Sequence, residues 1–261
     1  MMNLQKKAEY RLPFLIEFIN INDIINTRQG SQANGEIMSG LALKIVALST
    51  MIIDHYGAIF QNDIIIFRII GRLAFPIYCF LLVEGYYHTS NVKKYAARLL
   101  VFAFISEIPF DLAFFGEVGF RHQNIFFTLF IGLAALYFID KKEFEFWGKD
   151  VKFNNKALII FAASLLATFL RTDYQFIGII YISIFYLMKN QPKQKKFPLI
   201  ALIMFAVNMA SGMIQQFSLL ALAPVYFYNN KQGRKNKILQ MSFYLAYPLH
   251  LLVFYLIKNH P

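Results

Sequence analysis

The sequence predicts an all-α protein, a polytopic bundle of transmembrane helices, on two observations. Apolar residues make up 57% of the 261 residues and charged residues only 16%, whereas soluble domains carry roughly 25% charged residues. The apolar residues also gather in runs that approach the roughly 20 residues an α-helix needs to cross the ~30 Å hydrocarbon core of a bilayer.

The predicted spans fall into two groups by length. Long apolar runs occupy residues 41–60, 64–87, 95–115, 124–139 and 239–257. Shorter runs occupy residues 157–170, 175–188, 197–210 and 217–228. The shorter runs lie below the usual minimum of ~17 residues, so they are either short spans or re-entrant pieces. We therefore expect about nine spans, with seven as the alternative.

Basic residues alternate along the chain and predict the orientation of the helices. They are concentrated in the connections 88–98, 141–156, 189–196 and 231–237. The alternate connections and the C-terminal end hold only Arg121, Arg171 and Lys258. The positive-inside rule then places the N-terminus in the cytoplasm and the C-terminus outside. Because topology and anionic lipid headgroups account for the net charge of +11, no nucleic-acid partner is needed.

The sequence also predicts the domain boundaries and limits the chemistry that the chain can carry out. We expect residues 1–40 to form a cytoplasmic segment, amphipathic or disordered, and residues 41–261 to form a single integral-membrane domain. The chain carries one cysteine, Cys79, so it has no internal disulfide. Its five histidines lack the spacing of metal ligands, and no metal is predicted.

Ionisable residues inside the predicted spans are the functional candidates, because a charge at mid-span costs at least ~2.5–3.5 kcal/mol on insertion scales. The predicted orientation brings most of them to the outer half of the membrane. This outer cluster comprises Asp54, His55, Arg68, Arg72, Glu107, Asp111, Gln123, Asn124 and His250, with Tyr247 one turn before His250.

Within this outer cluster, Asp54 and His55 are adjacent and point about 100° apart on a helix, so a direct pair between them is not expected. Gly71 and Pro76 flank Arg72 and would permit close packing and a broken helix.

Two interpretations of the charged pairs stay open. Arg68 and Arg72, and likewise Glu107 and Asp111, are spaced i,i+4 and share a helix face. The two pairs either neutralise each other between neighbouring helices or serve histidine-centred acid–base chemistry or ion coupling.

Several stretches resemble the TraX family, which is known for acetylating the N-terminus of conjugative pilin. They are LKIVALSTMIIDHYGAIF, GRLAFPI, EGYYHT, SEIPFDL and the closing FYLAYPLHLLVFYLI. The resemblance covers residues 41–140 and 240–257, and residues 141–239 mainly in hydropathy. It implies a multi-pass acetyltransferase of the bacterial cytoplasmic membrane that uses acetyl-CoA as the acyl donor.

The family in turn is distantly similar to bacterial membrane O-acyltransferases, which carry Arg-x10-His in their first span. Lys44 and His55 have this spacing, with Lys in place of Arg. The resemblance implies that His55 is the general base. Eleven residues of helix span about 16 Å, so Lys44 would lie near the cytoplasm and His55 toward the opposite side.

The resemblance also implies roles for other residues. The donor's phosphates would meet Lys44, Lys93, Lys94 and Arg98. Catalysis would use His55, Asp54, Arg72, Glu107, Asp111 and Asn124. Substrate binding would use Arg68, Gln123, Tyr247 and His250. The acceptor would be a peptide N-terminus such as that of a pilin-like protein, an envelope glycan or a lipid headgroup. A proton-coupled transporter is the main alternative, and a non-catalytic assembly factor for envelope peptides is a third.

Overall fold

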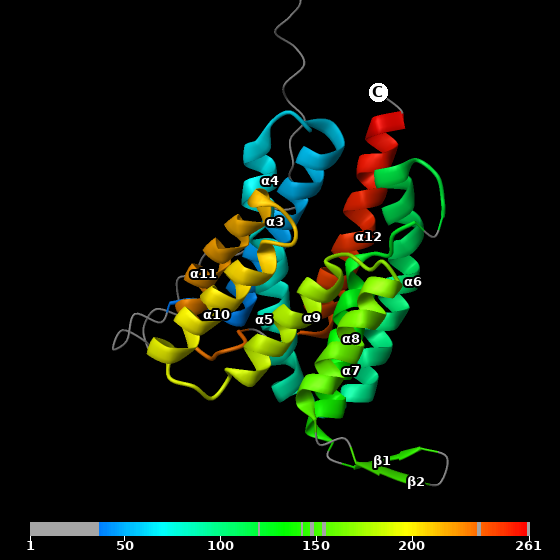
Figure 1. Ribbon diagram of the computed structural model, residues 1–261. Coiled ribbons are helices and arrows are strands. Elements are labelled where there is room, and N and C mark those ends of the chain that lie inside the picture. The colour runs from blue at the N-terminus through cyan, green and yellow to red at the C-terminus, as the bar shows by residue number, and fades with distance from the viewer. Residues whose placement is uncertain are drawn as a thin grey trace, which may run out of the picture.

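The computed structural model describes residues 37–119, 121–141, 143–146, 149–152, 155–233 and 236–259. Most of these residues lie in helices that run along one direction of the molecule, up and down (Figure 1). Residues 1–36 of the predicted N-terminal segment 1–40 lie outside the described residues.

The first half of the chain forms five helices, several of which begin at a polar capping residue. Ser39 accepts a hydrogen bond at 3.2 Å from the amide of Ala42 in the first turn of the first helix, which is the usual role of serine at a helix N-terminus. The helices are α3 (Gly40–Phe60), α4 (Ile65–Gly71), α5 (Ala74–His88), α6 (Val92–Phe115) and α7 (Ile125–Asp140).

The second half begins with a short antiparallel hairpin that the sequence did not predict, β1 (Glu143–Phe146) and β2 (Lys149–Lys152). The elements that follow are α8 (Lys156–Phe169), α9 (Gln175–Leu187), α10 (Lys193–Asn208), the 3-10 helix η2 (Met213–Ala221), α11 (Leu222–Tyr226) and α12 (Lys237–Asn259). All nine predicted apolar segments are therefore helical, and the predicted all-α class is confirmed apart from this hairpin.

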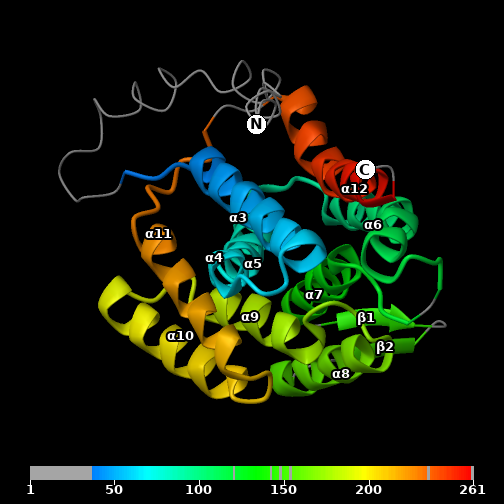
Figure 2. The ribbon, with the colours of Figure 1, turned by 90° about the horizontal axis from the view of Figure 1, so that it is seen from above.

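The helices pack around α3 and α5. Helix α3 contacts α4, α5 and α12, while α6 lies between α12 and α7. Helices α8 and α9 pack on α7, α10 lies beside α9, and η2 packs on α10, α4 and α5 (Figure 2). Between these helices lies the core, in which Leu43, Ile77, Leu133 and Tyr181 are fully buried.

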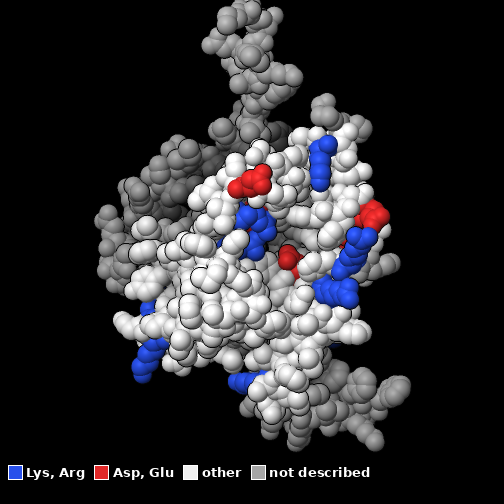
Figure 3. All heavy atoms as spheres, turned by 45° about the horizontal axis from the view of Figure 1, so that its top comes forward, with Lys and Arg blue, Asp and Glu red and all other residues white. Residues whose placement is uncertain are grey.

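The outward faces of the helices are apolar. Phe161 and Phe169 of α8, Leu202 of α10, and Leu249 and Val253 of α12 are all exposed. The space-filling view shows broad surfaces without charge, and charges near the ends of the molecule (Figure 3). This distribution is opposite to that of a soluble protein and matches a lipid environment.

Among the described residues, three helices are long and apolar enough to cross a membrane: Gly40–Phe60, the α4–α5 unit Ile65–His88, and Lys237–Asn259. Shorter apolar helices occupy Ile125–Asp140, Lys156–Phe169, Gln175–Leu187 and Met213–Tyr226. Membrane-spanning helices are thus present by length and composition, whereas the count of nine spans stays a prediction.

A break between α4 and α5 places Arg72 at the end of a short helix. Helix α4 ends at Gly71 and α5 begins at Ala74, as the Gly71 and Pro76 flanks of Arg72 predicted. Gly71 lies directly against Asp54 of α3, and a Cβ atom there would overlap the Asp54 carboxylate. Gly57 packs against Phe67 in the same way. Glycine at both positions therefore permits the close approach of α3 and α4.

Replacing Gly71 by Ala should force α3 and α4 apart and lower the free energy of unfolding by about 1–3 kcal/mol, the usual cost of overpacking. Thermal unfolding of the purified protein in detergent measures this. Gly119→Ala is the matched control, because a Cβ atom at Gly119 meets no neighbour within 4 Å. Equal melting temperatures for the two variants would contradict the close α3–α4 contact.

Candidate functional site

The Asp54 carboxylate on α3 binds two arginines. Nη2 of Arg72 donates to Oδ1 at 2.9 Å and to Oδ2 at 3.0 Å. Nη1 of Arg68 lies 2.9 Å from Oδ2 and donates to the Asp54 carbonyl at 3.2 Å. Arg72 also donates to Oε1 of Gln215 at 3.2 Å and to the carbonyl of Arg68 at 3.3 Å. Asp54 and the arginines therefore join α3, α4 and η2 in one charge-assisted network.

His55, the next residue along α3, turns to α12 instead and contacts His250. The Nδ1 atom of His55 lies 2.7 Å from Nε2 of His250, and Nδ1 of His250 lies 2.7 Å from the carbonyl of Ala246. Because a carbonyl only accepts, Nδ1 of His250 carries the hydrogen, and in the neutral ring Nε2 is then an acceptor. His55 must donate from Nδ1, which leaves Nε2 of His55 as the basic nitrogen.

Aromatic rings hold this histidine pair in place. The His55 and His250 rings are stacked with centroids 5.0 Å apart. Phe114 of α6 and Tyr247 of α12 meet the His55 ring edge-on, at 5.2 Å and 5.9 Å. The Tyr247 hydroxyl is buried and has no hydrogen-bond partner among the described residues, so a polar group is available beside the pair.

The acidic residues of α6 form a separate group. Glu107 accepts hydrogen bonds from the backbone and side chain of Asn124, and Asp111 accepts from the amide of Gly119 at 2.8 Å. The alternative in which Arg68 and Arg72 neutralise these carboxylates is therefore wrong, because Asp54 takes that role. Asn124 is committed to structure, since its side chain also caps α7 by accepting from the Phe126 amide.

The sequence did not single out the loop that joins α8 and α9. Arg171, Tyr174 and Gln175 have positive φ values of 52°, 62° and 42°, an uncommon conformation for residues other than glycine. The loop is joined to Gln123, whose amide donates to the Arg171 carbonyl at 3.1 Å and whose carbonyl accepts from the Asp173 amide at 2.8 Å.

This loop carries polar groups to the arginines. The Tyr174 ring stacks on Phe75 at 3.8 Å and lies 5.9 Å from the Arg72 guanidinium. Burial raises the pKa of the Asp173 carboxyl, while the charges of His122 and Arg72 oppose that rise. The only sequence signal for this group is the polar break RTDYQ between two apolar runs.

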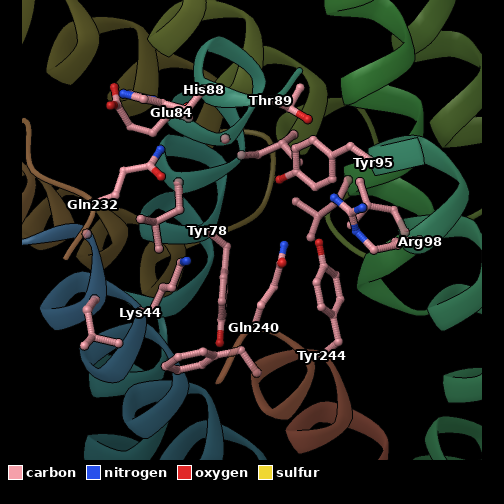
Figure 4. Close-up of a pocket in the computed structure, with 18 of the residues that line it drawn as sticks. Lys44, Tyr78, Glu84, His88, Thr89, Tyr95, Arg98, Gln232, Gln240 and Tyr244 are labelled. Atoms are coloured by element: carbon pink, nitrogen blue, oxygen red, sulfur yellow. The ribbon is translucent and has the colours of Figure 1, made fainter. Parts of the chain in front are cut away.

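A cavity of about 540 Å³ opens at the opposite end of the helices. Its walls come from α3, α5, α6, α7 and α12, together with the connection that precedes α12. In Figure 4, Lys44 and Gln232 lie on one side, Arg98, Tyr95 and Tyr244 lie on the other, and Tyr78 stands between them.

The cavity extends from the basic connections toward the histidine pair. Its lining includes Thr89 and Lys237 near one end and Met51 and Tyr247 deeper in the bundle. Met51 is one helical turn before His55, and Tyr247 touches the His55 ring. Along α3 the lining from Gly40 to Met51 corresponds to a depth of about 16 Å at 1.5 Å per residue.

The predicted donor-binding residues divide into two groups. Lys44 and Arg98 line the cavity, and each lies near an aromatic ring, with Lys44 5.9 Å from the Phe243 ring and Arg98 5.5 Å from the Tyr95 ring. Lys93 and Lys94 are exposed and do not line it. The structure therefore brings two of the four predicted basic residues into the cavity and leaves the other two outside.

Sequence comparison identifies the family. The family model described as TraX protein matches residues 39–258. The chain belongs to the TraX family. The resemblance expected from the sequence is confirmed, and it extends through the segment 141–239, which had matched mainly in hydropathy.

Two relatives of this TraX-family chain are bacterial proteins. A probable fimbrial assembly protein, FimC of serogroup H1, from Dichelobacter nodosus is 29% identical over 244 residues, or 82% of this chain and 93% of the relative. An uncharacterized protein of Rickettsia prowazekii is 30% identical over 96 residues, or 37% of this chain and 36% of the relative. No solved structure matches the chain significantly.

Arg72 and Arg68 should differ in their contribution to stability. The Arg72 side chain is 14% exposed and binds both carboxylate oxygens, whereas that of Arg68 is 31% exposed and binds one. Arg72→Lys loses the guanidinium that reaches Asp54, Gln215 and the Arg68 carbonyl at once, and should lower the free energy of unfolding by about 1–3 kcal/mol. Arg68→Lys should cost less than about 1 kcal/mol. Denaturant unfolding in detergent compares them, and the reverse ranking would contradict the described network.

Proposed function

We propose that this TraX-family chain is an integral-membrane acyltransferase that moves the acetyl group of acetyl-CoA to an amine or hydroxyl acceptor. The observation that supports the proposal is the cavity between α3, α5 and α12, which runs from the basic connections to Met51 and Tyr247, and Tyr247 packs against the His55 ring. A donor bound at one end would thus present its thioester to a base at the other.

The topology proposed for this activity has about nine spans in the bacterial cytoplasmic membrane. Connections with clustered lysines join α5 to α6, α7 to α8, α9 to α10 and α11 to α12, and the cavity opens at the same end of the helices. The positive-inside rule supports a cytoplasmic position for this end. The N-terminus would then be cytoplasmic and the C-terminus outside, and the donor would enter from the compartment in which it is made.

The cavity residues suit an anionic donor with a long flexible arm. Lys44 and Arg98 supply positive charge, and Arg98 can hold a phosphate with two parallel hydrogen bonds. Between them, the lining is mainly apolar and includes several aromatic rings, among them Tyr78 and Tyr244. A mainly apolar channel with charge at its mouth favours an extended, mainly apolar arm over a compact polar ligand.

His55 would act as the general base. As the acceptor's nitrogen or oxygen forms a bond to the acetyl carbon and the carbon–sulfur bond breaks, Nε2 of His55 takes the acceptor's proton and can return it to the leaving thiolate. His250 keeps Nε2 of His55 unprotonated in the resting state and accepts from Nδ1 throughout. The buried Tyr247 hydroxyl would donate to the oxygen on which negative charge develops.

The acceptor would approach from the face that holds the arginine network. Figure 3 shows a hollow on this face in which basic and acidic side chains lie close together. Arg68 is the more exposed arginine of the network, and Gln123 stands beside the α8–α9 loop. The relative named as a probable fimbrial assembly protein supports a pilin-like peptide as the acceptor, alongside envelope glycans and lipid headgroups.

Replacing His55 by Ala should reduce acetyl transfer by a factor of about 10²–10⁴, the range of general-base catalysis. His250→Ala should reduce it less, because the base remains but its tautomer is no longer set. Transfer of radiolabelled acetyl groups from acetyl-CoA to peptide, glycan and lipid acceptors measures this. Tyr56→Phe, which keeps the ring contacts of the neighbouring position on α3, is the control. Full transfer by the His55 variant would refute its role.

Replacing Lys44 or Arg98 by Ala should weaken acetyl-CoA binding roughly 10–100-fold, because each removes a charge-assisted contact of ~1.5–3 kcal/mol. Calorimetry on the purified protein measures this, with Lys156→Gln, at an exposed position outside the cavity, as the control.

The proposed orientation has a test of its own. Acetyl-CoA, which does not cross membranes, should support transfer in inside-out vesicles but not in right-side-out vesicles. Transfer only in right-side-out vesicles would overturn the proposed orientation.

A further inference from the structure

The cavity changes in character between its two ends. Basic side chains line the end near the connections, whereas uncharged side chains line the inner end, toward the histidine pair. The inner end is formed by Met51 of α3, Phe126 and Leu129 of α7, and Tyr247 of α12. A ligand with an anionic part and an apolar tip would therefore lie with its tip at the inner end, because apolar groups are best placed against apolar walls.

This inner end is narrow. Met51, Phe126 and Leu129 are each 7% exposed, and Tyr247 is 4% exposed. Side chains that line a cavity and yet expose so little surface leave little free space beside them. The rings of Phe126 and Tyr247 also meet edge-on with centroids 5.3 Å apart, so each ring holds the other in place. A group that occupies this end must therefore be small.

Met51 lies on the side of the cavity that faces His55. It precedes His55 by one helical turn on α3, so the two side chains share a helix face. Helical side chains lean toward the N-terminus of their helix, which brings the His55 ring over the turn that carries Met51. A group that extends from the cavity along α3 toward His55 therefore meets the Met51 side chain.

Among these wall residues, Met51 can be shortened without disturbing the histidine pair. The Tyr247 ring contacts the His55 ring with centroids 5.9 Å apart, and Phe126 supports Tyr247. Truncation of either ring would therefore remove packing around His55. The Met51 side chain is an unbranched thioether that fills space. Shortening it would lengthen the cavity toward His55 and leave both rings in place.

We propose that the inner end of the cavity holds the acyl group of the donor, and that the Met51 side chain limits this group to a short chain. The inference rests on the proposed function and adds the residue that sets its acyl-chain specificity. An acetyl group ends in a methyl directly after the thioester carbonyl, whereas a longer acyl chain would overlap Met51. Close-packed sites respond to a change of even one methylene, so one side chain is sufficient to discriminate.

The test measures the dissociation constants of acetyl-CoA and butyryl-CoA for the full-length protein, by calorimetry in detergent. The wild-type protein should bind butyryl-CoA about tenfold more weakly than acetyl-CoA, the usual effect of overpacking a filled site. Met51→Ala should bring the ratio of the two constants from about ten to about one, because the side-chain atoms beyond Cβ are removed and the longer chain can take their place.

Further variants make the result specific to this position. Met51→Leu conserves volume and should keep the wild-type ratio. Met204→Ala makes the same truncation at a fully buried methionine of α10 that does not line the cavity, and it should also keep the wild-type ratio. Met51→Val makes a smaller opening, worth about fourfold in the ratio, and it replaces Met51→Ala if that variant does not fold.

The outcomes separate this inference from the proposed function. Equal ratios for the wild-type protein and the shortened Met51 variant would refute the acyl-length role, as would a shift in Met204→Ala as large as that in Met51→Ala. In either case, a wild-type protein that binds acetyl-CoA and transfers acetyl groups leaves the acyltransferase proposal standing. A wild-type protein that binds neither thioester refutes the donor assignment, and the acyl-length role with it.

Discussion

The arrangement of the site depends on the buried carboxylate of Asp54. A carboxylate within an apolar bundle is tolerated only when cations compensate it, and here two arginines from the neighbouring short helix do so. This requirement fixes the rotation of α3 about its axis. Since successive residues on a helix point about 100° apart, a helix that turns Asp54 to the arginines turns His55 to α12. The ion pair and the histidine contact are therefore two results of one helix orientation.

Close packing makes that orientation possible. The glycine contact between α3 and α4 brings the guanidinium of Arg72, the residue that directly follows α4, within reach of both carboxylate oxygens. An alanine at Gly71 would hold the guanidinium away from its partner. The burial of these three charged side chains therefore depends on the close backbone packing of α3 and α4 as well as on the ion pairs.

The sequence predicted the helices well because lipid imposes a simple rule on composition. Every predicted apolar run is helical, and the flanks of Arg72 correctly indicated a break. The partners were harder to predict, because contact between His55 and His250 spans 195 positions and no local pattern encodes it. Gln215 and Asp173 were missed since they lie between short apolar runs, where a polar residue resembles an ordinary loop. The wrong pairing of the arginines with Glu107 and Asp111 shows that helix-face spacing identifies candidates for ion pairs but not their partners.

The chain of hydrogen bonds from His55 ends at a backbone carbonyl, and this end point limits where charge can travel. The Ala246 carbonyl accepts a hydrogen bond from His250, and Ala246 has no titratable side chain that could carry a proton onward. The hydrogen-bonded chain from His55 through His250 therefore ends at this carbonyl. A proton taken up at Nε2 of His55 would have to leave from the same nitrogen, so this pair by itself would not conduct protons through the bundle.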